Sequence, residues 1–95
     1  MEITKVKVFP VGEEKLKAFV SITFDDEFIV RDLKIIQGNK GLFVAMPSKK
    51  RKDGTYTETA HPLNNEMRER IEAAVFEAYY QALQEEGASN LAGQE

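Results

Sequence analysis

Leu16-Lys17-Ala18-Phe19-Val20-Ser21-Ile22-Thr23-Phe24 is the stretch that decides the fold. Every second residue from Leu16 to Phe24 is apolar, and mostly polar residues lie between them. A period of two is typical of a β-strand with one face on the core and the other toward solvent. We therefore expect residues 16–24 to form a strand of a one-sided sheet.

The segments on either side of this strand predict more strands joined by short turns. Before it, Thr4, Val6 and Val8 alternate with Lys5 and Lys7, and residues 10–14 have the composition of a turn. After the acidic turn at 25–27, residues 28–36 are β-branched and apolar, although Asp32 interrupts the alternation and predicts a bulge or a change of face. A turn at 37–41 leads into residues 42–46, and Tyr56–Thr59 forms a further short strand. Short turns between successive strands favour an antiparallel meander.

One amphipathic helix follows the strands. Pro62 and the cap candidates Asn64 and Asn65 precede a stripe with spacings of three and four: Met67, Ile71, Ala74, Val75, Ala78 and Ala82. Gly87 is the expected helix stop. The sequence thus predicts an α+β fold, an antiparallel β-sheet meander with a packed C-terminal helix, with one domain at 1–86 and a flexible acidic tail at 87–95.

Composition indicates one globular domain. The 95 residues are 42% hydrophobic and 31% charged, and they include no cysteine. No apolar run has the length that a bilayer span requires, and the N-terminus lacks the apolar stretch of a signal peptide. We expect a cytoplasmic protein without membrane insertion.

The net charge of −3 conceals an uneven distribution. All thirteen Lys and Arg residues lie at or before Arg70, together with eleven of the sixteen acids. The chain up to Arg70 therefore has a net positive charge, and this allows a local anion-binding surface on an acidic protein.

Residues for catalysis are scarce. His61 is the only histidine, it stands next to Pro62, and no Gly-x-Ser-x-Gly turn presents a serine. The acids at 25–27 lack the spacing of a calcium loop, and the glycines at 38 and 41 lie between strands instead of before a helix. We expect no enzyme activity, no catalytic residues, no metal site and no cofactor.

The strongest binding motif is the basic run Lys49-Lys50-Arg51-Lys52, which we place on a projecting loop. Consecutive cations can follow a phosphate backbone and release its counterions. A loop kept basic for solubility is the alternative. Arg68 and Arg70 extend the basic run, unless they pair with Glu72 and Glu66 along the helix. Four aromatic residues are available for stacking on bases or for the core: Phe43, Tyr56, Tyr79 and Tyr80.

Two longer segments resemble the stage V sporulation protein G (SpoVG) family. They are Ser21 to Val30 and Gly41-Leu42-Phe43-Val44-Ala45-Met46-Pro47-Ser48, the latter followed by the basic run, Gly54 and Ala60-His61-Pro62. The resemblance covers most of the chain before Gly87. It implies a SpoVG-like domain at 1–86 that forms a homodimer and acts as a DNA- and RNA-binding regulator linked to sporulation and septation.

Carried over by position, the resemblance implies nucleic-acid contacts at the basic run and at the helix entry: Lys49, Lys50, Arg51, Lys52, Arg68 and Arg70. DNA and/or RNA is then the expected partner. The alternative is a cell-division or septation factor that binds a protein of the division machinery through the acidic helix end or an exposed strand edge.

Overall fold

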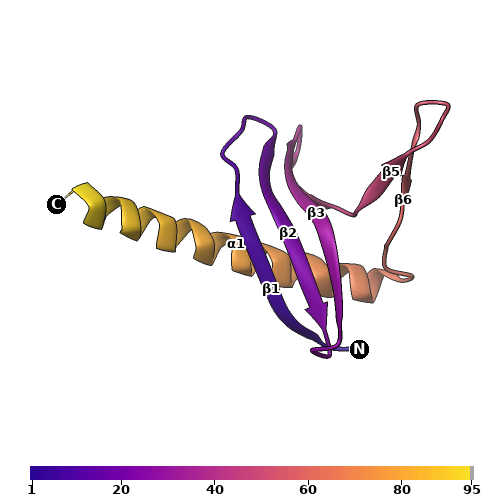
Figure 1. Cartoon of the computed structure of the whole chain (residues 1–95), viewed down its shortest axis with the longest axis horizontal. Coiled ribbons are helices and arrows are strands. Elements are labelled where there is room, and N and C mark those ends of the chain that lie inside the picture. The colour runs from indigo at the N-terminus through magenta and orange to yellow at the C-terminus, as the bar shows by residue number, and fades with distance from the viewer. Residues whose placement is uncertain (95) are drawn as a thin grey trace.

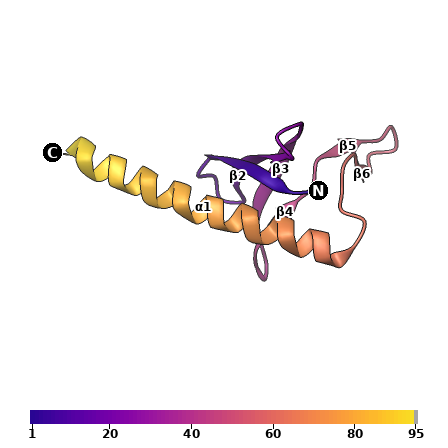
Figure 2. The same cartoon turned by 90° about the horizontal axis from the view of Figure 1, so that it is seen from below.

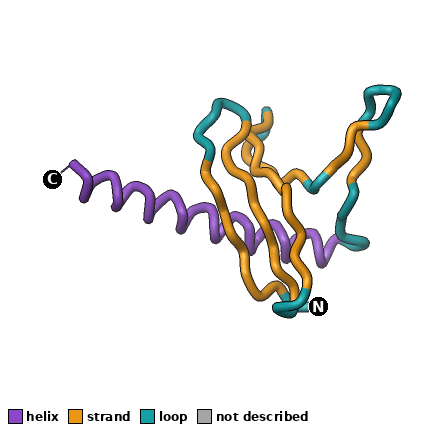
Figure 3. Tube along the Cα trace, in the orientation of Figure 1, coloured by secondary structure: helices purple, strands orange, loops and turns teal. Residues whose placement is uncertain are grey.

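The chain folds into an antiparallel sheet, a projecting two-stranded ribbon and one long helix (Figures 1 and 3). A computed structural model describes residues 1–94, with side chains for residues 1–85. Its elements are β1 (Ile3–Pro10), β2 (Leu16–Phe24), β3 (Phe28–Gly38), β4 (Gly41–Ala45), β5 (Ser48–Lys50), β6 (Tyr56–Glu58) and α1 (Asn65–Gln94). The predicted α+β class is confirmed.

The first four strands form a meander in the order β1-β2-β3-β4, with every neighbouring pair antiparallel. The predicted topology is confirmed. The acidic turn fits it well, since Asp25 and Asp26 both take positive φ angles and the Glu27 N–H donates to the Phe24 carbonyl at 2.9 Å. Two left-handed residues give a hairpin turn the twist of its strands. Asp25 also accepts the Glu2 N–H at 2.9 Å, so this turn holds the start of β1.

The interruption at Asp32 is a bulge, as predicted. Val20 pairs with Leu33 and Ile22 pairs with Val30, so β3 contains one more residue than β2 between these pairs. Asp32 has a φ of 68°, a left-handed conformation that aspartate tolerates better than β-branched residues do. The extra residue returns Leu33 to the core face.

The core lies between α1 and one face of the sheet (Figure 2). The alternation in β2 buries its even-numbered residues Ala18 to Phe24, and Leu33, Ile35 and Val44 continue the same face on β3 and β4. Helix α1 contributes Ile71, Val75 and Tyr79. Burial of each large aliphatic side chain stabilises the fold by roughly 1.5–3 kcal/mol.

Helix α1 begins where its cap was predicted and extends beyond its predicted end. Asn64 Oδ1 accepts the Met67 N–H at 2.8 Å, which is the N-cap bond. The helix does not stop at Gly87 but continues to Gln94. Glycine within a helix costs only about 1 kcal/mol, and the neighbouring alanine, glutamine and glutamate favour the helix. The division into a domain at 1–86 and a flexible tail stays a prediction, and Glu95 lies outside the described residues. No helix in the described part of the chain is long and apolar enough to cross a membrane.

Candidate nucleic-acid interface

The basic run lies on a β-hairpin and not on a loop, which corrects the prediction. We call residues 48–59 the basic ribbon. Lys49 and Lys50 belong to β5, where they pair with Thr57 and Tyr56, and Arg51 and Lys52 begin the turn. The Asp-Gly turn is the reason, because it closes a hairpin between segments whose backbones can then pair.

The tip of the basic ribbon is fixed by local hydrogen bonds. Gly54, with a φ of 90°, donates its N–H to the Arg51 carbonyl at 3.0 Å, and the Thr55 carbonyl accepts the Arg51 N–H at 2.6 Å. Asp53 Oδ1 accepts the Thr55 hydroxyl at 2.7 Å and the Thr55 N–H at 3.0 Å. These bonds, the hydroxyl first, lower the pKa of Asp53 below its ordinary value of 3.8. Asp53 is therefore an ordered carboxylate beside the cations.

The two faces of the basic ribbon differ in chemistry. Lys49 lies opposite Thr57, and the Arg51 Nε–H donates to Thr57 Oγ1, so Lys49 and Arg51 share one face. The other face carries Lys50 opposite Tyr56. All four cations are exposed. A hollow of about 390 Å³ follows the basic run and has six lining residues: Lys49, Lys50, Arg51, Lys52, Thr57 and Thr59.

The basic ribbon is anchored at its base and projects from the body of the molecule (Figures 1 and 3). The buried residue Pro47 ends the link from β4, and its carbonyl accepts the Thr59 N–H at 2.8 Å. This bond brings the two ends of the basic ribbon together. A narrow base and an exposed, cationic tip let the ribbon reach a large anionic surface without a change in the core.

The helix-entry arginines have different surroundings. Arg70 donates from Nη2 to the Met1 carbonyl at 3.1 Å and from Nη1 to Met67 Sδ at 3.7 Å, so it joins the N-terminus to α1. Arg68 is half-buried on the first helical turn. Arg70 lines a separate hollow together with Leu63, Glu66 and other residues of the helix entry, and this hollow shares no lining residue with the one along the basic ribbon. The basic ribbon and the helix entry are thus two separate groups of cations.

The aromatic candidates divide between the core and the surface. Tyr79 is only 6% exposed and belongs to the core. Phe43, Tyr56 and Tyr80 are exposed, and Tyr80 lies with its ring centroid 5.7 Å from that of Tyr79. Of the four aromatic candidates, these three retain an exposed surface.

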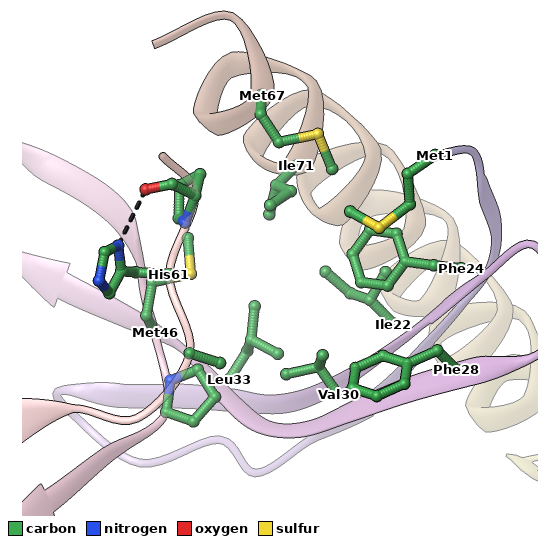
Figure 4. A pocket seen from close by; sticks show the side chains of 13 residues that line it. Met1, Ile22, Phe24, Phe28, Val30, Leu33, Met46, His61, Met67 and Ile71 are labelled. Carbon is green, nitrogen blue, oxygen red and sulfur yellow. Dashed lines mark hydrogen bonds between the residues drawn. The ribbon is translucent and has the colours of Figure 1, made fainter. Parts of the chain in front are cut away.

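An apolar hollow of about 230 Å³ that was not predicted from the sequence lies between α1 and the sheet (Figure 4). Met67 and Ile71 from the helix face Leu33, Met46 and other apolar side chains across it. His61 lies at its rim, where Nδ1 donates to the Pro62 carbonyl at 2.9 Å, a structural hydrogen bond of the kind expected for this residue. The N-terminus, β2, β3, the link after β4 and the start of α1 all line the hollow, so no local motif signals it. Its walls suit an apolar group and offer no pair of groups for acid–base chemistry.

No metal-binding cluster occurs among the residues that the structure describes. Asp25 and Asp26 of the acidic turn make hydrogen bonds to the start of β1. Asp25 accepts the Glu2 N–H, and the Asp26 N–H donates to Thr4 Oγ1 at 3.0 Å. These residues stabilise the N-terminal hairpin.

Comparison with known proteins gives a consistent result. The model of the SpoVG family matches residues 1–81. A protein of Anaeromyxobacter sp. (strain Fw109-5) is 59% identical over 98% of this chain and 96% of its own length, and one of Bdellovibrio bacteriovorus is 63% identical over 92% of this chain and 81% of its own. A protein of Myxococcus xanthus is 54% identical over 96% of this chain and 92% of its own. All three are named "Putative septation protein SpoVG". The chain belongs to the SpoVG family.

Proposed function

We propose that this protein is a DNA- or RNA-binding regulator that contacts the phosphate backbone through the basic ribbon. One observation carries the proposal: four consecutive exposed cations stand on a structured hairpin that projects from an otherwise acidic protein. A hairpin orders its backbone before binding, so less conformational entropy is lost than with a mobile loop.

The helix-entry arginines form a secondary contact in this proposal. Arg68 extends the positive surface, whereas Arg70 already donates to the Met1 carbonyl and has fewer free donors. The proposed active form is a homodimer, because two basic ribbons on one body raise the local positive charge and the avidity. Regulation then follows from occupancy of a transcript or an operator-like site.

The test is binding to a mixed pool of DNA and RNA fragments over a series of salt concentrations. Lys49→Ala/Lys50→Ala is compared with Lys15→Ala/Lys40→Ala, which removes the same charge from turns outside the basic ribbon. Each lost phosphate contact is expected to flatten the log–log salt slope by about 0.9 on duplex DNA. We expect this change in the ribbon variant only. Equal effects in the two variants, or no binding by the wild type at low salt, contradict the proposal.

A second candidate function is septation through protein contacts; the names of the three relatives mention septation alone. The apolar hollow beside Met67 and Ile71 offers a place for a partner's apolar side chain. Under this alternative, replacement of the four cations of the basic ribbon leaves the binding of a division protein intact. If cells that carry the ribbon variant no longer septate normally, the nucleic-acid function is favoured instead.

A further inference from the structure

The face of the sheet opposite α1 carries aromatic residues in register across neighbouring strands. Phe9 on β1 pairs with Phe19 on β2, Phe19 with Lys34 on β3, and Lys34 with Ala45 on β4. Directly opposed residues in an antiparallel sheet point to the same side, with Cβ atoms about 4.5–5.5 Å apart. One row of side chains therefore runs across all four strands. We call the side that carries this row the outer face.

The outer face is apolar to a degree that a solvent-facing sheet surface does not need. Phe9 is 57% exposed, Phe19 39% and Phe43 45%. Among the described elements, α1 packs on the opposite side, and the basic ribbon leaves from the edge of the sheet (Figure 2). The solvent-facing side of an antiparallel sheet normally carries polar side chains. Three exposed phenylalanines on it point to a binding surface.

A groove joins the outer face to the basic ribbon. Its volume is about 500 Å³, and its lining residues come from β2, β3, the end of β4 and the ribbon: Phe19, Asp32, Lys34, Ile36, Ala45, Met46, Ser48 and Tyr56. Tyr56 is 68% exposed and pairs with Lys50, so the groove begins beside the cations of the ribbon. Tyr56 and Phe19 thus line one continuous depression.

The charges of the outer face match an anionic chain. Lys34 lies in the row with Phe19, and Lys5 and Lys7 share the face on β1, because they pair with Thr23 and Ser21. Asp32 is the one acid that lines the groove. Exposed aromatic rings beside lysines suit the binding of a single-stranded nucleic acid, because its unpaired bases stack on the rings while its phosphates contact the cations. A duplex cannot use the rings, because its bases are stacked inside it.

We propose that the outer face and its groove bind the unpaired bases of single-stranded DNA or RNA, with Phe19 and Tyr56 as stacking residues. This inference rests on the proposed function: the basic ribbon supplies phosphate contacts on any nucleic acid, and the outer face makes the protein prefer unpaired strands. The strand runs from the ribbon through the groove onto the row of Phe9, Phe19 and Lys34.

The test compares binding of a labelled oligothymidylate, an oligouridylate and a mixed-sequence duplex by fluorescence anisotropy. Phe19→Ala/Tyr56→Ala is expected to weaken binding of both single strands by roughly 10-fold or more. The charge is unchanged, so the salt slope and the affinity for the duplex remain those of the wild type. Phe19→Trp/Tyr56→Phe keeps both rings and is expected to bind like the wild type.

Two controls separate stacking from folding. Phe28→Ala removes an exposed ring next to the acidic turn, on the core side of the sheet, and is expected to leave single-strand binding unchanged. Phe19→Leu/Tyr56→Leu keeps apolar bulk without aromatic rings, so it retains the fold by circular dichroism and is expected to lose binding like the alanine variant.

Four results overturn the inference. Single-strand binding by the alanine and leucine variants at the wild-type level excludes stacking at these residues, and the proposed function then stands if the ribbon variant still loses affinity. An equal loss on the duplex shows that the preference for unpaired strands is absent. If the alanine or leucine variant differs from the wild type in oligomeric state, measured by sedimentation, the outer face binds a second copy of the chain. Failure of the wild type to bind any probe contradicts the proposed function as well.

Discussion

At the scale of single residues, Asp53 connects pH to the geometry of the basic ribbon. Its pKa is lowered by the Thr55 hydroxyl and N–H, so the bonds stabilise the tip fully above pH 3.8 and are lost as the pH falls through the lowered pKa of the folded state. We expect the Thr55 amide chemical shift to titrate with a midpoint below 3.8. In Asp53→Asn the amide keeps an acceptor, and this titration should disappear. A midpoint at or above 3.8 contradicts the assignment.

Asp32 gives a second residue-scale prediction. Its left-handed φ costs β-branched residues about 1–2 kcal/mol and costs glycine nothing. Asp32→Val is therefore expected to lower the free energy of unfolding in urea by about 1–2 kcal/mol, and Asp32→Gly to leave it equal or higher. Equal destabilisation by both variants would show that the aspartate side chain, and not the backbone of the bulge, matters for stability.

The residues whose structural roles were predicted correctly from the sequence interact with residues close to them in the chain. The Asn64 cap and the Asp32 bulge depend on neighbours within a few positions, which the sequence displays. Tyr79 could not be assigned to the core on this basis, because the same aromatic residue suits a core and a stacking surface equally until its burial is known.

At the scale of elements, β3 contains one buried and one exposed isoleucine, because the bulge at Asp32 places positions 29 and 35 on opposite faces of the sheet. Ile35 is fully buried, and Ile29 is 45% exposed. Ile35→Ala should lower the free energy of unfolding by about 2–5 kcal/mol, since it removes buried methylene and methyl groups and leaves a cavity. Ile29→Ala serves as the matched control, with a loss well below that value in the same urea titration. Similar losses would contradict the assigned face of β3.

The strands of the sheet and β6 were predictable from their apolar, aromatic or β-branched residues, and β5 was not. In β5 all three residues are exposed, so no burial pattern reveals the strand, and only the Asp53-Gly54 turn indicates a hairpin. The end of α1 was missed for a related reason: one glycine is a weak signal when good helix formers surround it.

At the scale of the whole molecule, stability should depend on the chain before residue 87. Among the side chains that the structure describes, Tyr79 is the last helix residue in the buried core. A stop after Glu86 is therefore expected to cost less than about 1 kcal/mol, a decrease in Tm of less than roughly 4–8 °C for a domain of this size. A stop after Ala78, which removes Tyr79, should cost considerably more. A large loss from the shorter truncation would contradict a domain that ends at residue 86.

The two proposed binding surfaces, the basic ribbon and the outer face, differ in how far the sequence could reveal them. Four adjacent cations are visible in any reading of the chain. The outer face is different, because Phe9, Phe19 and Lys34 become neighbours only through strand pairing, and the register depends on the bulge at Asp32. To predict a surface that strand pairing assembles from distant segments, one must know the topology of the sheet as well as the composition of the chain.

The narrow base of the basic ribbon has a consequence for how such a protein diversifies. The carbonyl of Pro47 and the N–H of Thr59 join the two ends of the ribbon, and the tip is stabilised by its own bonds among Arg51, Asp53 and Thr55. Substitutions or insertions at the tip therefore leave the core unstrained. A lineage can therefore change the sequence of the tip by drift and selection at a few positions while it inherits the scaffold intact.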